Sequence, residues 1–232
     1  MDMHGRPTGI LMLDTQFARL PGDAGNPATW PFPVRIGVVK GASVAAVVDR
    51  GARGLESAFI TAAREMIERD RVAAITTTCG FLAIHQRTMA ASLDVPVATS
   101  SLLQVPSVER LLPPGRRAGI VTFDQARLTP DILAAAGAAA DTPIAGLPPE
   151  GRFHGYIRRS DTPERDALAV EIEEVVATFL GRHPEVGALV LECANLPTFS
   201  AALARRFRLP VFDIVTLINW LRSAIAPAEY GR

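Results

Sequence analysis

Two stretches of this chain follow the same pattern at positions 114 residues apart. The run V-A-A-I-T-T-T-C ends at Cys79, and the run V-G-A-L-V-L-E-C ends at Cys193. Two further pairs occur in the same order: V-P-V at 95–97 with L-P-V at 209–211, and G-I-L-M-L-D at 9–14 with G-I-V-T-F-D at 119–124. We infer a duplicated unit in which each copy carries one thiol at the same place.

Short apolar runs alternate with segments of helical period, which is typical of a parallel sheet flanked by helices. The predicted strands are 10–13, 35–39, 72–77, 97–98, 119–122, 186–192 and 211–212. The predicted helices are 55–69, 81–93, 102–112, 129–139, 163–181, 197–207 and 215–226. Together with the duplication, this pattern predicts an α/β fold of two pseudo-symmetric lobes. Each lobe is a doubly wound parallel sheet, and the active site lies in the cleft between them.

The two lobes divide the chain unequally. Residues 1–115 plus 210–232 are expected to form the N-terminal lobe with Cys79, and residues 116–209 the C-terminal lobe with Cys193. The last helix has no counterpart left to pack with in its own copy, so we expect it to return to the first copy.

One long loop interrupts the first copy. Residues 18–33 are dense in Pro, Gly, Asp and Asn, which is the composition of a loop. The loop follows the first strand, so it leaves the sheet at the carboxyl edge, where open α/β folds bind ligands. Two interpretations stay open at this point: a functional loop, or a surface excursion anchored by Trp30 and Phe32.

Charge and motif content exclude several classes of protein. The chain has 24 basic and 24 acidic residues, so no basic surplus indicates a nucleic-acid or anionic-membrane partner. The first residues lack the pattern of a signal peptide, and no apolar stretch approaches the ~18 residues of a membrane span. We expect a cytoplasmic protein with free thiols. The four histidines lack metal-ligand spacing, and Lys40 is the single lysine, which argues against pyridoxal phosphate. We predict no metal and no cofactor.

The position of each cysteine has chemical meaning. A thiol at the end of a strand lies over the start of the next helix, where the helix field lowers a thiol pKa from its usual value of about 8.5. Small and hydroxyl residues beside the thiols, Thr78, Gly80, Ala194 and Asn195, would let backbone N–H groups reach a bound carboxylate. One thiolate could then remove a proton next to the carboxylate while the other thiol returns one from the opposite face. The alternative for each cysteine is an inert, buried side chain.

Other polar residues fall near the predicted cleft. Asp14 ends the first strand and is the best acidic candidate on the Cys79 side, and Thr122 is a candidate hydroxyl donor. Glu192 directly precedes Cys193, so strand alternation predicts that it points to the opposite face. His154 lies in an irregular stretch of the second copy, and its role is left open.

These residues together resemble a known family. The segments T-T-C-G at 77–80, L-E-C-A-N-L at 191–196, L-D-T-Q-F…P-G-D-A-G-N-P and V-F-D-I-V at 211–215 resemble the aspartate/glutamate/hydantoin racemase superfamily. The resemblance implies cofactor-independent 1,1-proton transfer with Cys79 and Cys193 as the two acid–base groups. It also implies a substrate site lined by Asp14, Thr15, Thr78, Thr122 and Asn195.

The resemblance leaves several activities open. The superfamily also contains arylmalonate decarboxylases, maleate isomerases and dimethylsulfoniopropionate lyases. The decarboxylases keep one of the two thiols, so two thiols here argue against that branch. We predict an isomerase, a racemase or epimerase of a small carboxylate such as an amino acid or hydantoin. The alternatives are a cysteine-dependent lyase or cis–trans isomerase, and a two-lobed binding protein without activity. A homodimer is expected.

Overall fold

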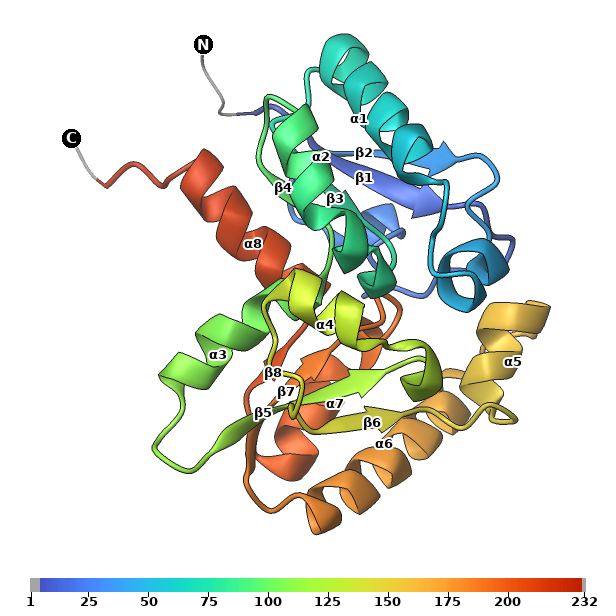
Figure 1. The fold of residues 1–232 in the computed structure, drawn as a ribbon, viewed down its shortest axis with the longest axis vertical. Helices are drawn as coiled ribbons and strands as arrows, with labels where there is room; N and C mark the ends of the chain where they lie inside the picture. Colours follow the sequence, from blue (N-terminus) through green and yellow to red (C-terminus); the bar gives the residue numbers. More distant parts are fainter. Residues whose placement is uncertain (1–4, 231–232) are drawn as a thin grey trace.

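The computed structural model describes residues 5–230 and arranges their strands into two parallel sheets, one in each lobe (Figure 1). The first sheet has the order β2-β1-β3-β4 and the second has the order β6-β5-β7-β8. The strands are β1 (Thr8–Leu13), β2 (Val34–Val39), β3 (Ala74–Thr77), β4 (Val97–Ala98), β5 (Arg117–Thr122), β6 (Ile144–Gly146), β7 (Val186–Leu191) and β8 (Val211–Phe212). In each sheet the strands of the lobe lie in the order second, first, third and fourth. The predicted two-lobed α/β fold is therefore confirmed.

Helices connect the strands and cover the sheets. The α-helices are α1 (Glu56–Asp70), α2 (Gln86–Ser92), α3 (Val105–Leu111), α4 (Pro130–Ala136), α5 (Arg152–Arg159), α6 (Arg165–Arg182), α7 (Pro197–Phe207) and α8 (Ile214–Ile225). Short 3₁₀ turns occupy Pro27–Thr29, Gly80–His85, Ser101–Gln104 and Gln125–Arg127, and a π-helical turn occupies Ala45–Asp49. None of the helices described here is long and apolar enough to cross a membrane.

Burial explains why the apolar runs became strands. Every residue of β3 and β7 is buried, as expected for central strands of a parallel sheet covered on both faces. In β1, Leu11 joins the core cluster that contains Phe59 and Met66 of α1. Its neighbour Ile10 joins the cluster that contains Ile214 of α8. Successive side chains of this strand therefore serve two different cores, one on each face of the sheet.

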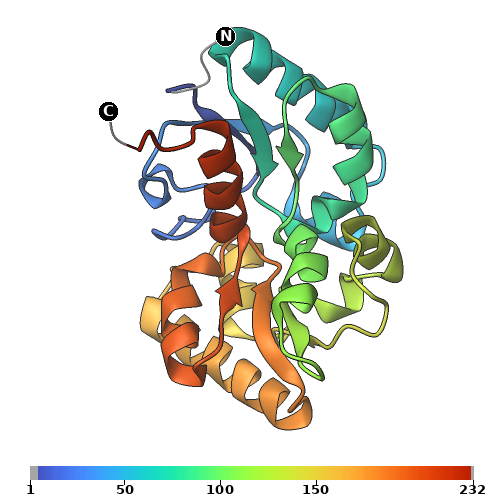
Figure 2. The same ribbon diagram turned by 90° about the vertical axis from the view of Figure 1, so that its left-hand side faces the viewer.

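The lobes exchange their last helices (Figure 2). Helix α3 follows the final strand of the first sheet but contacts β5 of the second. Helix α8 follows the final strand of the second sheet, and its Leu217 and Ile218 pack with Ala98 and Trp30 of the first lobe. The last helix therefore packs against the first lobe. Strand β8 still pairs with β7 of the second sheet, so the chain crosses back to the first lobe after Phe212 and not at the expected boundary, residue 210.

The loop of residues 18–33, called the crossing loop below, joins the two lobes. The Ala24 N–H donates to the carbonyl of Ala194, and Thr198 Oγ1 donates to the carbonyl of Pro21, both at 3.0 Å. Gly22 has φ +103° and lies so close to Thr198 that a Cβ would come within 2.5 Å of its Cα. Only glycine accommodates both this backbone angle and this approach. The loop is thus packed between lobes rather than extended into solvent.

Candidate active site

The two cysteines meet at the carboxyl edges of the facing sheets. Cys79 follows β3 and Cys193 follows β7, the equivalent strands of the two lobes. Both thiols are free and buried, and both line one cavity of about 30 Å³. The lining residues are Leu13, Thr15, Phe17, Arg19, Val44, Val48, Thr78, Cys79, Phe81, Phe123, Ile157, Glu192, Cys193 and Asn195. This space holds only one or two water molecules, so the cavity is too narrow for a carboxylate substrate.

Hydroxyl groups hold the end of β3 that presents Cys79. Thr77 Oγ1 donates to the carbonyl of Thr99 at 2.7 Å and accepts from the Cys79 N–H at 3.3 Å. Thr78 Oγ1 accepts from the Leu13 N–H at 3.1 Å. These bonds tie the cysteine to the neighbouring strands β1 and β4, so its backbone position is set by the sheet rather than by a free loop.

A chain of polar contacts links Cys193 to the crossing loop of the other lobe. The Cys193 thiol donates to Asn195 Oδ1 at 3.4 Å, and Asn195 Nδ2 donates to Asp23 Oδ2. Asp23 also accepts two bonds from Arg19 Nη1, at 2.9 and 3.1 Å, and one from the Gly25 N–H at 2.6 Å. The first lobe therefore orients the amide that contacts the thiol of the second lobe.

Arg19 brings a positive charge into the cavity wall. Its Nη2 donates to Thr15 Oγ1 at 2.9 Å, and its guanidinium carbon lies 4.6 Å from the centre of the Phe17 ring. The side chain is only 10% exposed. Burial raises the pKa of its partner Asp23, and the charge of Arg19 opposes that rise. Neither Arg19 nor Asp23 was predicted from the sequence; the length and position of the crossing loop were the only signals of their role.

The structure contradicts the predicted direction of the Glu192 side chain. It was expected to point away from Cys193, but its side chain lines the same cavity and is buried. Alternation fails because β7 ends at Leu191 and the chain bends at Cys193. Glu192 Oε2 accepts from Thr122 Oγ1 at 2.8 Å and from the Phe123 N–H at 3.2 Å. Burial raises the pKa of this carboxyl to about 7.

The electrostatic state of the thiols also differs from the expectation. Burial is the main cause that raises the pKa of both Cys79 and Cys193, and the nearby Glu192 raises both further. Backbone N–H groups of Phe81 and Asn195 act in the opposite direction but are outweighed. The predicted lowering of the thiol pKa is therefore wrong, because burial outweighs these backbone N–H groups.

The other predicted site residues fall at different distances from the cavity. Gly80 lies against the Glu192 side chain, Thr122 donates to it, and Ala194 binds the crossing loop through its carbonyl. Asp14 does not line the cavity: it is exposed, and its carboxylate accepts from the Gly41 N–H at 3.3 Å. His154 is buried, stacked on Phe123 at 4.0 Å between ring centres and bonded through Nε2 to the Phe123 carbonyl. It supports a cavity-lining residue without lining the cavity itself.

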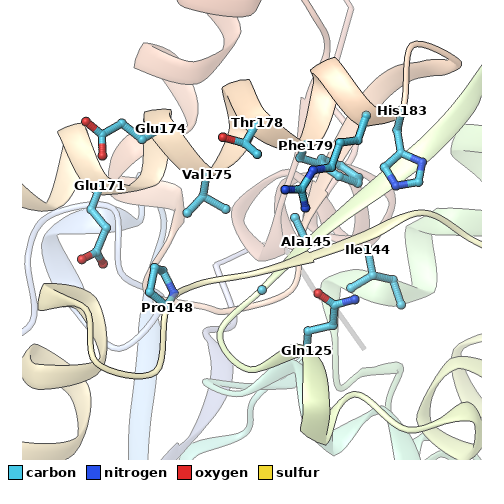
Figure 3. A pocket seen from close by; sticks show the side chains of 12 residues that line it. Gln125, Ile144, Ala145, Pro148, Glu171, Glu174, Val175, Thr178, Phe179 and His183 are labelled. Carbon is cyan, nitrogen blue, oxygen red and sulfur yellow. The ribbon is translucent and has the colours of Figure 1, made fainter.

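A larger hollow lies elsewhere and has a different character. It measures about 440 Å³ and runs between β6 and α6 (Figure 3). Glu171, Glu174 and Thr178 lie along one wall, with Gln125 and Ile144 opposite. This groove holds neither thiol, so size alone does not mark the reactive site. No cluster of side chains within residues 5–230 could hold a metal ion.

Comparison with solved structures defines the class of fold. The chain is similar to the Gly74Cys mutant of arylmalonate decarboxylase, solved in a sulfate-associated form, with a TM-score of 0.65 and 18% identity over 97% of this chain and 98% of that one. Allantoin racemase from Klebsiella pneumoniae gives a TM-score of 0.64 and 16% identity over 95% and 88% of the two chains. The protein thus has the two-lobed α/β fold of these enzymes. This likeness is one of fold, and it agrees with the resemblance seen in the sequence.

Sequence comparison identifies relatives with a different named activity. Dimethylsulfoniopropionate lyase of Durusdinium sp. clade D is 25% identical over 231 residues, which cover 96% of this chain and 76% of that protein. Dimethylsulfoniopropionate lyase 7 of Emiliania huxleyi is 26% identical over 236 residues, which cover 94% of this chain and 66% of that protein. No family model matches the chain. The relatives and structural neighbours are all named as enzymes, but their named reactions differ.

Proposed function

We propose that this protein is a cofactor-independent racemase or epimerase of a small carboxylate, such as an amino acid or a hydantoin-like compound. Cys79 and Cys193 act as the two acid–base groups. The observation that carries this proposal is that two free thiols, from equivalent strand ends of two lobes, line one small cavity. A single α-carbon held between them would present one face to each thiol, which is the geometry that inversion requires.

The reaction proceeds in two proton transfers. The thiolate form of one cysteine removes the proton from the carbon next to the carboxylate, and the electron pair spreads into that carboxylate. The thiol of the other cysteine then delivers its proton to the opposite face. The substrate leaves inverted, the two cysteines have exchanged protonation states, and the next turnover runs in reverse. One thiolate and one thiol are therefore needed at the start of every turnover.

Stabilising the intermediate is the main energetic problem. The α-proton of a carboxylate is far less acidic than a thiol, so the site must lower the barrier by stabilising negative charge on the carboxylate oxygens. Arg19 is the cation in the cavity wall, and its planar guanidinium suits a carboxylate. Its position is fixed by Asp23 and Thr15, so little reorganisation is needed when charge develops.

Substrate entry requires the cavity to open. The present cavity of about 30 Å³ is too small for a carboxylic acid with a substituted α-carbon. Arg19 comes from the start of the crossing loop and Phe17 directly precedes it, and the contacts of this loop with Ala194 and Thr198 cover the site. We propose that this loop moves to admit substrate and closes again to exclude water during proton transfer.

A lyase is the second candidate, favoured by one specific observation. Proteins named dimethylsulfoniopropionate lyases match 93% or more of this chain. Elimination begins with the same α-proton abstraction by a cysteine thiolate. If the β-carbon carries a leaving group such as a sulfonium, the electron pair forms a C=C bond and the sulfide departs with the electrons of its C–S bond. One base is sufficient for this reaction, so the second thiol would not be essential.

The experiment that separates these functions uses two assays in heavy water. Chiral α-carboxylates and hydantoins are followed by NMR for α-deuterium and by chiral chromatography for inversion. Dimethylsulfoniopropionate is followed by headspace detection of dimethyl sulfide. A racemase gives deuterium at the α-carbon with inversion, and both Cys79→Ser and Cys193→Ser abolish inversion. Racemisation that persists in Cys79→Ser contradicts the two-base mechanism, and sulfide release that requires only one cysteine supports the lyase.

A further inference from the structure

Glu192 is a buried carboxyl at the junction of the lobes that the two-thiol mechanism does not use. It is 1% exposed, although it follows a strand of the second lobe and reaches the first. A Cβ placed on Gly80 would come within 2.5 Å of Glu192 Oε1, so this oxygen lies against the residue that follows Cys79. The absence of a side chain at Gly80 is what makes room for the carboxyl group. The carboxyl therefore lies at the wall of the cavity that both thiols line.

The two oxygens of this carboxyl are held differently. Oε2 accepts from Thr122 and Phe123, whereas Oε1 is buried and forms no well-aligned hydrogen bond. The N–H groups of Gly80 and Phe81 lie close enough to lower the carboxyl pKa, but burial outweighs them. An unsatisfied buried oxygen costs free energy, and it is retained where it has a further use. Oε1 can take up a proton while Oε2 keeps its bonds to Thr122 and Phe123.

No cation neutralises Glu192 within residues 5–230. The positive group in the cavity wall, Arg19, makes its ion pair with Asp23. The titratable and charged groups on the elements around Glu192 include Cys79, Cys193, Arg19, Asp23, Tyr156, His154, Asp124, Arg158 and His85, and His85 pairs with Glu56. Of these, the two thiols are the groups whose pKa the Glu192 charge raises.

We propose that Glu192 is the proton acceptor that converts a cysteine of this site from thiol to thiolate. The inference rests on the proposed function and deepens it. In the activating step the S–H bond of the cysteine breaks, the proton binds Glu192 Oε1, and the negative charge moves from the carboxylate to sulfur. The reverse transfer restores the resting state. Glu192 acts through the cysteines and does not touch the α-carbon.

The charge balance of the cavity supports this assignment. A carboxylate and a thiolate side by side in a closed cavity are two buried like charges, and such pairs titrate as one coupled unit. Burial makes ionisation of either thiol alone unfavourable, so the single negative charge rests on Glu192 above pH 7. Moving a proton from sulfur to Glu192 creates the thiolate without adding a charge. The transfer is uphill, because burial leaves each thiol a weaker acid than Glu192, but it costs less than ionising a thiol beside a charged carboxylate.

The test measures thiol reactivity without any substrate. The rate of alkylation of Cys79 and Cys193 by iodoacetamide is followed by mass spectrometry from pH 5 to 9.5, in wild type and in Glu192→Gln. In wild type we expect the alkylation rate to rise up to about pH 7 and then level off. Above that pH the cysteine–Glu192 pair has lost one proton, and the fraction of pairs present as thiolate and carboxylic acid no longer changes with pH. In Glu192→Gln the plateau should disappear, and the rate should rise about tenfold per pH unit.

A purely electrostatic or structural role predicts something else. If Glu192 acts only through its charge, Glu192→Gln would lower the thiol pKa and shift the alkylation profile to lower pH, and the plateau would remain. That outcome overturns the proposal. Glu185→Gln is the matched control, because Glu185 is surface-exposed and pairs with His183. It should leave the profile unchanged. If Glu192→Gln does not fold, Thr122→Val carries the test: loss of the hydroxyl donor should move the break in the profile upward by about half a unit or more, and an unchanged break contradicts the proposal.

Turnover provides a readout that separates this proposal from the proposed function. With an active substrate, Glu192→Gln should lower kcat/KM at least 100-fold near pH 7 and remove the limb of the pH profile near that value, and Glu192→Asp should restore part of it. Racemase activity that keeps its pH profile in Glu192→Gln refutes the role of Glu192 alone. A normal alkylation plateau with no turnover of any α-carboxylate refutes the function alone.

Discussion

The two lobes share one sheet order but hold their thiols in different ways. Cys193 donates to Asn195, which is bonded to Asp23 of the opposite lobe. Cys79 has a backbone N–H from Phe81 near its sulfur and, within residues 5–230, no side-chain hydrogen-bond partner. The connection after the first strand is also unequal: the crossing loop follows β1, whereas a short 3₁₀ turn follows β5.

This asymmetry shows how a duplicated fold builds a site that neither copy contains. Asp23 of the first lobe orients the amide beside Cys193, and Glu192 of the second lobe reaches the backbone beside Cys79. Each thiol is therefore adjusted by the lobe to which it does not belong. Cys193 therefore has an ordered hydrogen-bonded environment. Cys79 has fewer hydrogen bonds and is followed by Gly80, against which the unsatisfied oxygen of Glu192 lies.

The largest expected effect comes from exchanging each thiol. Cys79→Ser and Cys193→Ser should each lower racemisation by 10³-fold or more, because a serine hydroxyl is a far weaker acid and base at neutral pH. Each variant should retain α-deuterium exchange for only one enantiomer of the substrate, the one whose proton faces the remaining thiol. Equal α-deuterium exchange for both enantiomers in either variant would contradict the assignment of one substrate face to each thiol. NMR with pure enantiomers measures it.

The stability of the protein should depend on pH through Glu192. The pKa of this carboxyl rises from 4.5 to about 7 on folding, so the folded protein binds more protons than the unfolded chain between these values. Stability due to the protonated group is complete below pH 4.5 and is lost as the pH rises through 7. The loss is roughly 3 kcal/mol. Burial also raises the pKa of Asp23 and Asp213, which add a slope of the same sign.

Urea titrations of wild type and Glu192→Gln from pH 4 to 8 isolate the contribution of this one group. The difference in unfolding free energy between the two proteins should change by a few kcal/mol in that window. A difference that stays constant with pH would mean that folding does not shift the pKa of Glu192.

Substitution of Gly80 tests the contact between the lobes. A Cβ at Gly80 would overlap the backbone carbonyl and the carboxyl of Glu192, so Gly80→Ala should destabilise the protein by about 1–3 kcal/mol. It should also shift the alkylation profile of Cys79 more than that of Cys193. Gly181→Ala is the matched control, because Gly181 lies in α6 with no atom within 4 Å of its Cβ position. It should stabilise by about 0.5–1 kcal/mol.

The smallest expected effect concerns the cation of the crossing loop. Arg19→Lys keeps the charge beside Asp23 but loses the planar, forked donor, so kcat/KM for a carboxylate should fall about tenfold. A rise in KM with constant kcat would assign Arg19 to substrate binding, and an equal fall in kcat and kcat/KM would assign it to the charged intermediate. If neither kcat nor KM changes, Arg19 contributes to neither substrate binding nor the charged intermediate.

Much of the fold was predictable from periodicity and repetition. Apolar runs of four or more residues identified the central strands, and the cysteine repeat identified the equivalent positions of β3 and β7. Strand β6 and helix α5 were not predicted, and Gly155 interrupts the helical pattern of α5. The first turn of α5 is instead held from outside, where Glu171 accepts from the N–H groups of Arg152 and Phe153.

The site was less predictable because its polar residues act across the lobes. The cysteines, Thr78 and Asn195 could be placed by their position at strand ends. Glu192 could not, because the alternation rule stops where the strand stops. Arg19 reaches the cavity from a loop without regular structure, and only long-range contacts determine where such a loop lies. The thiol pKa values depend on burial, which the local helix geometry does not reveal.

The exchange of terminal helices has a consequence for biosynthesis. Residues 214–225 complete the apolar face formed by Ile10, Ala98 and Trp30, yet they leave the ribosome about a hundred residues after that half of the protein has been made. The earlier half therefore waits with an uncovered patch, which is the kind of surface that holding chaperones bind. Translation pauses or early termination before residue 214 should yield an aggregation-prone fragment rather than an independently stable half.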